Sequence, residues 1–165
     1  RCQQAGQMVT AIGKIHDIFA GKHMDKVLPG HNNSESMASL LQALQNGVEG
    51  LIFANFVDFD MLYGHRNDPQ GYALALETFD AALPQVLASL RKEDILAICA
   101  DHGNDPTTPS SDHSREYAPL LVAGPQVRPA ALGIRHTFAD LGQTAAAYLG
   151  AAPLAAGQSF LHEII

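Results

Sequence analysis

Aspartate and histidine side chains directly after an apolar run are the residues of this chain best placed for chemistry. Asp101 and His102 follow the strand-sized run 95–100, and His113 comes after a loop rich in Gly, Asn, Pro, Thr and Ser. A buried strand that ends in a carboxylate and an imidazole gives up hydrophobic burial, which is typical of a ligand site. The loop is long enough to fold back, so we expect His113 to join Asp101 and His102 around a metal cation.

A second pair of potential metal ligands follows another apolar run. Residues 51–57 read LIFANFV, and Asp60 and His65 come shortly after them. The nearly continuous apolar character predicts a central parallel strand that is covered on both faces. The carboxyl ends of parallel strands share one edge of an open α/β sheet, where such sheets bind ligands. The sequence therefore predicts five converging metal ligands: Asp60, His65, Asp101, His102 and His113.

The mixture of aspartate and histidine ligands indicates which metals to expect. It suits Zn²⁺ or Mn²⁺ better than Ca²⁺, which prefers oxygen alone, or Cu(I), which prefers sulfur. A catalytic ion takes three or four protein ligands, so five candidates favour two ions. Paired ions about 4 Å apart recur in phosphoryl transfer because they stabilise both the attacking and the leaving oxygen. We therefore expect chemistry on a phosphate group.

Helices and strands alternate along the chain, which predicts an α/β fold with a mainly parallel sheet flanked by helices. Residues 51–57, a helix over 71–90 and a strand over 95–100 form a predicted right-handed βαβ unit. Ser34 and Thr137 are the expected caps of two further helices. Additional strands are predicted at 8–12 and 120–122.

Composition excludes several other classes of protein. The chain has 165 residues, 47% of them hydrophobic and 16% charged, as expected for one globular domain. A net charge of −7, with ten Lys and Arg in all, argues against a nucleic-acid surface. No apolar run is long enough to span a bilayer, and no secretory leader is recognisable. We expect a cytoplasmic protein in which Cys2 and Cys99 behave as small hydrophobic residues.

Segments of the chain also carry a family likeness. They are VDFDMLYGHRND at 57–68, ADHGNDPT at 100–107 and DHSREY at 112–117, extended by 13–21 and 132–140. Together they closely resemble phosphopentomutases, which are members of the alkaline phosphatase superfamily. The resemblance implies an enzyme of nucleoside catabolism that interconverts ribose 1-phosphate, or its deoxy form, and the 5-phosphate. In that family two Mn²⁺ ions flank a phosphorylated threonine.

The resemblance also implies a division of the five ligands between two ions. Asp60, His65 and His113 correspond to the ligands of one ion, and Asp101 and His102 to ligands of the other. The family's remaining aspartate ligand, its nucleophilic threonine and its sugar-binding cap domain have no counterpart in the sequence. We therefore expect residues 1–165 to be the C-terminal portion of an alkaline-phosphatase-like core, incomplete without the N-terminal strands and the cap, and inactive alone.

Several alternatives stay open from the sequence. Arg66 and Arg115 follow ligand positions and are candidates to bind the phosphate of a pentose phosphate substrate, although surface ion pairing is the commoner fate of an arginine. Asp58 is an alternative to Asp60 as the metal ligand. If Asp60 is the ligand, Asp58 either supports the ligands from behind or caps a helix. A cofactor-independent phosphoglycerate mutase or a phosphodiesterase would use nearly the same metal ligands. A non-catalytic metal-binding fragment is the third reading.

Overall fold

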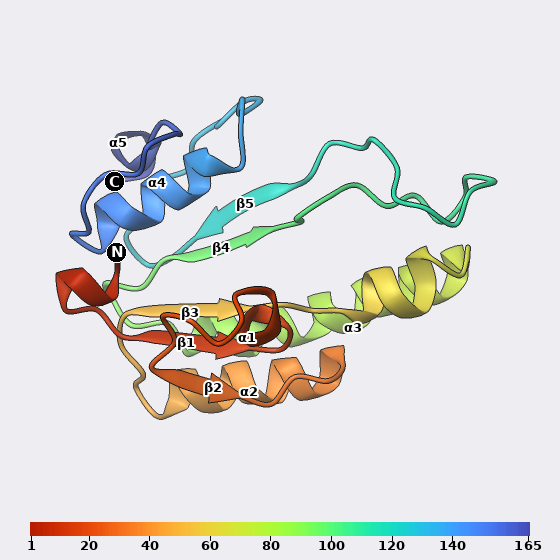
Figure 1. Ribbon diagram of the computed structural model, residues 1–165, viewed down its shortest axis with the longest axis horizontal. Coiled ribbons are helices and arrows are strands. Elements are labelled where there is room, and N and C mark those ends of the chain that lie inside the picture. Colours follow the sequence, from red (N-terminus) through yellow and green to blue (C-terminus); the bar gives the residue numbers. More distant parts are fainter.

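The structure is a computed structural model that describes residues 1–165 and contains two small sheets with helices packed around them (Figure 1). The first sheet has three parallel strands in the order β2-β1-β3. Its strands are β1 (Val9–Ile12), β2 (Lys26–Leu28) and β3 (Leu51–Ala54). The second sheet pairs β4 (Leu96–Cys99) with β5 (Leu120–Ala123) in antiparallel orientation. The predicted α/β fold with a parallel sheet flanked by helices is confirmed.

The core is centred on β1, the middle strand of the parallel sheet. All four of its residues are buried, and Ala11 and Ile12 are completely inaccessible to solvent. Parallel strands need long crossover connections, which here contain α1 (Ile15–Ile18) and α2 (Asn33–Gln45). The tight contact between Gly13 and Gly30 at the strand ends leaves no room for a side chain, since a Cβ at Gly30 would lie 2.6 Å from the Gly13 backbone.

Two long helices begin at capped positions next to the strands. The first, α2, is capped by Asn32, whose side chain accepts a hydrogen bond from the Glu35 N–H, so the predicted Ser34 cap is off by two residues. The second, α3 (Pro69–Ala88), begins with proline after the capping residue Asp68. It is long, but no helix of the structure combines the length and apolar character needed to cross a membrane.

The predicted βαβ unit is wrong in its last step. The strand β4 hydrogen-bonds only to β5, so it is not part of the sheet that contains β3, although β3 and β4 run in the same direction in Figure 1. Each of these two strands consequently has one edge without a strand partner. The prediction that residues 51–57 form a strand covered on both faces is also wrong, since Phe53 is 43% exposed. Apolar patterning indicates a buried strand, but it does not specify which strand lies next to it.

The chain exposes more surface than a self-contained domain of its size. Its accessible surface is 9993 Å², whereas a compact monomer of 17.6 kDa has about 7,900 Å². Cys99 on β4 is exposed rather than buried as predicted, and Leu121 on β5 is 61% exposed. Much of the second sheet is therefore not covered by the rest of the chain.

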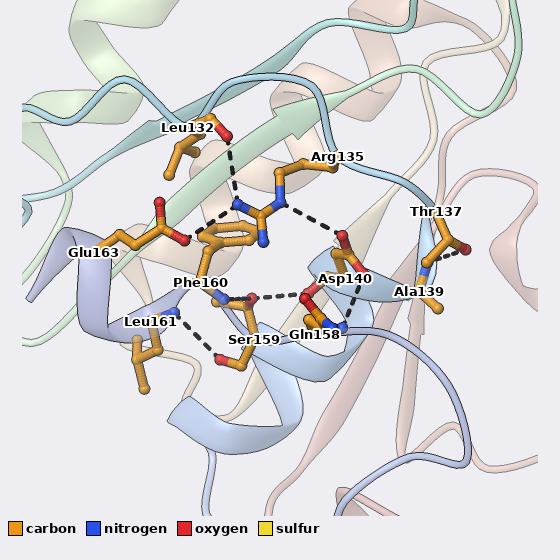
Figure 2. Close-up of polar contacts among 11 residues, drawn as sticks. Leu132, Arg135, Thr137, Ala139, Asp140, Gln158, Ser159, Phe160, Leu161 and Glu163 are labelled. Atoms are coloured by element: carbon orange, nitrogen blue, oxygen red, sulfur yellow. Dashed lines mark hydrogen bonds and ion pairs between the residues drawn. The ribbon is translucent and has the colours of Figure 1, made fainter.

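A network of polar contacts joins the last two helices, α4 (Ala139–Tyr148) and α5 (Leu161–Ile164) (Figure 2). The Arg135 guanidinium contacts the carboxylates of Asp140 and Glu163 at 3.4 Å and 3.1 Å. It also lies over the ring of Phe160, 5.2 Å from the centroid, and Phe160 is almost completely buried. Near the start of α4, the Ala139 N–H donates to the Thr137 hydroxyl, two residues from it, while Phe138 occupies the cap position. These contacts stabilise the C-terminal segment far from the candidate metal ligands.

Candidate metal centre

Asp60 lies in a π-helical turn, η2 (Phe59–Gly64), between β3 and α3. Turns of this kind are rare and frequently occur at functional sites. The wide turn brings His65 back toward Asp60: the His65 N–H donates to the Asp60 carbonyl at 3.0 Å, and His65 Nε2 lies 3.4 Å from Asp60 Oδ2. The Asp60 carboxylate is 30% exposed, so it remains accessible to a ligand.

The loop that carries the other histidines folds back on itself, as predicted. An antiparallel bridge pairs Gly103 with Ser114, and the Asp105 N–H donates to the Ser114 hydroxyl at 2.8 Å. Glycine is required at 103 because a Cβ there would lie 2.3 Å from the Ser114 carbonyl oxygen. This bridge places His113 over His102, with ring centroids 3.8 Å apart and planes inclined by 27°.

The two segments meet in one cluster of potential ligands. Single ligand atoms of Asp60, His102 and His113 all lie within 4.8 Å of one another. His113 Nε2 is 3.4 Å from Asp60 Oδ1. Donor atoms at about 2.1 Å from a tetrahedral metal ion are roughly 3.4 Å apart, so the separation of His113 Nε2 from Asp60 Oδ1 fits a divalent cation between them. An acidic oxygen with two imidazole nitrogens is also a suitable donor set for Zn²⁺ or Mn²⁺.

The hydrogen bond made by His65 favours the ligand form of its ring. Its Nδ1 lies 2.5 Å from the Ser111 carbonyl oxygen, which can only accept, so in the neutral ring Nδ1 carries the proton and Nε2 has the free lone pair. Metal-binding histidines usually have such a bond from the second ring nitrogen, which fixes the orientation of the ring. His65 is therefore a fourth candidate donor at the edge of the cluster, beside Asp60.

The remaining predicted site residues lie at the periphery. The Asp101 carboxylate is 73% exposed, and its nearest candidate partner is His102 Nε2 at 3.6 Å. Arg66 and Arg115 are both exposed, and neither forms an ion pair within the chain. The structure thus brings Asp60, His65, His102 and His113 together, whereas the side chains of Asp101, Arg66 and Arg115 are exposed to solvent.

Asp58 has a different set of contacts. Its carboxylate accepts a hydrogen bond from the Asn33 N–H at 2.8 Å, and its own N–H donates to the Asn33 side chain at 3.0 Å. These two bonds attach the start of α2 to the segment before η2. Asp58 is therefore not in the cluster of potential ligands, which contains Asp60.

Two asparagines at the site were not singled out from the sequence. Asn104 donates from its amide to Asp60 Oδ1 at 2.7 Å. Asn67 has a positive φ of 50° and donates to the carbonyls of Thr108 and Ser110 at 2.8 Å and 2.9 Å. Asparagine is the non-glycine residue that adopts this conformation most readily, but its position before Asp68-Pro69 indicates only a turn. No local pattern predicts which distant loop an amide contacts.

Nearby titratable groups are affected by the same contacts. The hydroxyl and then the N–H of Thr107, both hydrogen-bonded to Asp105, lower the pKa of the Asp105 carboxyl. Burial, and next the charge of Asp60, raise the pKa of Tyr72, whose ring packs against Phe59. Asp105 is therefore anionic at neutral pH, and Tyr72 keeps its proton.

Comparison with known families is consistent with this geometry. Residues 10–153, which are most of the chain, match the sequence profile of the metalloenzyme superfamily. The chain belongs to the metalloenzyme superfamily. The match includes every candidate ligand, from Asp60 to His113.

Individual members of the superfamily are closely similar in sequence. The chain is 55% identical to a phosphopentomutase of Desulfitobacterium hafniense over 164 residues, which is 99% of the chain and 42% of that protein. It is also 55% identical to a phosphopentomutase of Dictyoglomus turgidum over 157 residues, 94% of the chain and 40% of that protein. The resemblance to phosphopentomutases is confirmed, and the chain spans about two fifths of the length of these relatives.

Solved structures share the fold at low sequence identity. A Leishmania mexicana phosphoglycerate mutase, determined at low cobalt concentration, superposes with a TM-score of 0.72 and 18% identity over 99% of this chain and 38% of its own. The PH0037 protein of Pyrococcus horikoshii has a TM-score of 0.59 and 20% identity over 74% of this chain and 39% of its own. These two similarities show that the chain shares its fold with parts of these proteins.

Proposed function

We propose that residues 1–165 are the C-terminal, metal-binding portion of the core of a phosphopentomutase. The observation that carries this proposal is the 55% identity to phosphopentomutases over nearly the whole chain. The cluster of Asp60, His102 and His113 supports it, because these residues come from distant segments and have the spacing of metal ligands. The reaction would interconvert ribose 1-phosphate, or deoxyribose 1-phosphate, and the corresponding 5-phosphate.

The proposed cofactors are two divalent ions, with Mn²⁺ as the first choice. Asp60, His65 and His113 would hold one ion, and Asp101 and His102 the other, together with ligands from outside these residues. Such ions neutralise charge on a phosphoryl group during its transfer. Because His102 also lies beside Asp60 and His113, the two sites would share one edge of the cluster.

The remaining residues of the site would bind and orient the pentose phosphate. Arg66 and Arg115 closely follow His65 and His113 in the sequence, are exposed, have no acidic partner, and offer the forked geometry that matches a phosphate. The Nδ1–H group of His65 donates to the Ser111 carbonyl oxygen, so His65 would not act as a general base through that nitrogen. No hydroxyl nucleophile is assigned in this chain, and the phosphorylated threonine would come from the rest of the core.

The rest of the catalytic core and the cap domain would be supplied by a longer chain. The relatives are more than twice as long as the matched region. The strands β3 and β4 each have an edge without a partner, and about 2,000 Å² of surface exceeds the expectation for a compact monomer. Unpaired strand edges and exposed apolar side chains are features that a further strand would cover. Two free cysteines are consistent with the reducing cytoplasm as its location.

The experiment that tests the function is an assay of ribose 1-phosphate conversion with and without Mn²⁺. The 165-residue chain alone should be inactive, and the chain joined to the N-terminal part of a phosphopentomutase should be active only with the metal. Phosphoglycerate and a phosphodiester are offered as competing substrates. Preferential turnover of either would overturn the pentose assignment, and so would full activity of the 165 residues alone. A joined protein that binds Mn²⁺ but converts none of the substrates would indicate a non-catalytic metal-binding fragment.

A further inference from the structure

The amide of Asn104 contacts a candidate metal ligand directly. Its Nδ2 donates to Asp60 Oδ1 at 2.7 Å, a short bond in a partly buried position. The same oxygen lies 3.4 Å from His113 Nε2, and the other oxygen lies 3.4 Å from His65 Nε2. The Asp60 carboxylate therefore has three neighbours. The Asn104 amide and His113 lie at Oδ1, and His65 lies at Oδ2, which the amide does not contact.

We propose that Asn104 is a positioning residue, which sets the rotation of the Asp60 carboxylate so that its oxygens face the histidines. This inference rests on the metal site proposed above. The torsion about the Cβ–Cγ bond of aspartate is only broadly restricted, and hydrogen-bond partners of metal ligands fix such orientations. Asn104 is two residues from His102, so its bond also connects the loop that bears the histidines to the turn η2 that bears Asp60.

The backbone beside Asp60 is shaped to admit this amide. Gly64 is buried in η2, and a Cβ placed there would lie 2.0 Å from Nδ2, 2.5 Å from Cγ and 2.6 Å from Oδ1 of Asn104. The φ of Gly64 is outside the left-handed region, so glycine is not needed for the conformation of the turn. We conclude that the absence of a side chain at Gly64 makes space for Asn104. A substitution at Gly64 is therefore a second way to displace the amide.

Three variants of the complete protein test the proposal by Mn²⁺ titration calorimetry: Asn104→Ala, Gly64→Ala and the double variant. Asn104→Ala should weaken Mn²⁺ binding about 10- to 100-fold, the usual effect of removing a partner of a metal ligand. Gly64→Ala should weaken it by a similar factor because the new methyl group displaces the amide. The double variant should bind Mn²⁺ like Asn104→Ala alone. The three Asn104 atoms that the methyl group of Gly64→Ala would meet are absent from it. Asn46→Ala, at the exposed end of α2, is the matched control and should bind like the wild type.

Wild-type affinity for Mn²⁺ in Asn104→Ala would overturn the proposal, as would fully additive losses in the double variant. A purely structural role would lower the urea midpoint of the metal-free protein and leave the Mn²⁺ affinity of the folded protein unchanged. Titration well below the unfolding transition separates these cases. The titration requires no turnover, so failure of the mutase assay and failure of this proposal give different results.

Discussion

The imidazole of His113 stacks on that of His102, with centroids 3.8 Å apart, while its Nε2 reaches 3.4 Å from Asp60 Oδ1. His113 thus contacts both the other arm of its own loop and the η2 turn. The contact depends on the bridge between Gly103 and Ser114, which returns the loop to its starting point. We therefore expect His113 to be central to metal binding.

Replacement of His113 by alanine tests this role. Removing a hydrogen-bond partner of a metal ligand weakens metal binding by up to roughly 100-fold. The His113→Ala variant should lose more Mn²⁺ affinity than that, because a donor atom itself is removed. Titration calorimetry measures the effect. The control is His162→Ala on the exposed face of α5, which should bind Mn²⁺ normally. Equal affinities of the two variants would exclude His113 as a ligand.

Asn67 should hold the loop 106–111 in place through its side chain. Asn67→Gly keeps the positive φ without strain and removes the side-chain amide, so two good hydrogen bonds of about 1 kcal/mol each are lost. Hydrogen exchange of the Thr108 and Asp112 amides should become roughly tenfold faster or more. Exchange in β1, far along the chain, serves as the internal control. An unchanged rate in the loop would show that the bridge of Gly103 alone orders it.

Asp140 should make stability depend on pH in the acid range. The N–H of Gln158, with help from the Arg135 guanidinium, outweighs burial and lowers the pKa of Asp140. A lowered pKa contributes stability that is complete above the unfolded value, about 3.9, and is lost as the pH falls through the folded value. Urea midpoints between pH 5 and pH 2 should therefore fall less steeply in Asp140→Asn than in the wild type. Parallel pH profiles would contradict this assignment.

Phe160 should be the main apolar anchor of the C-terminal segment. It is 1% exposed, and its replacement by alanine leaves a cavity beneath Arg135. Large-to-small changes of this kind cost about 3–5 kcal/mol, which urea unfolding would measure. Phe138 is 60% exposed, so Phe138→Ala should cost no more than about 0.5 kcal/mol. A similar cost for both variants would mean that Phe160 does not stabilise the segment.

Local elements were predictable because their signals are local. Each predicted strand is observed within a few residues, and the helices after Asn32 and Asp68 begin with side-chain caps. The caps themselves were harder to place: α2 uses Asn32 rather than Ser34, since Asn32 is the residue whose backbone is extended. Boundaries depend on one pair of dihedral angles, which neighbouring polar residues can adopt equally well.

The sequence by itself determined the set of candidate metal ligands, because Asp60, His65, Asp101, His102 and His113 stand out by their types and their positions after apolar runs. Only the tertiary structure decided how they are grouped. His102 lies with Asp60 and His113, whereas Asp101 faces solvent. The separation of β4 from β3 and the choice of Asn104 as the partner of Asp60 were also decided there. The reason is that strand pairing and loop closure depend on contacts between distant segments, which periodicity and propensity do not encode.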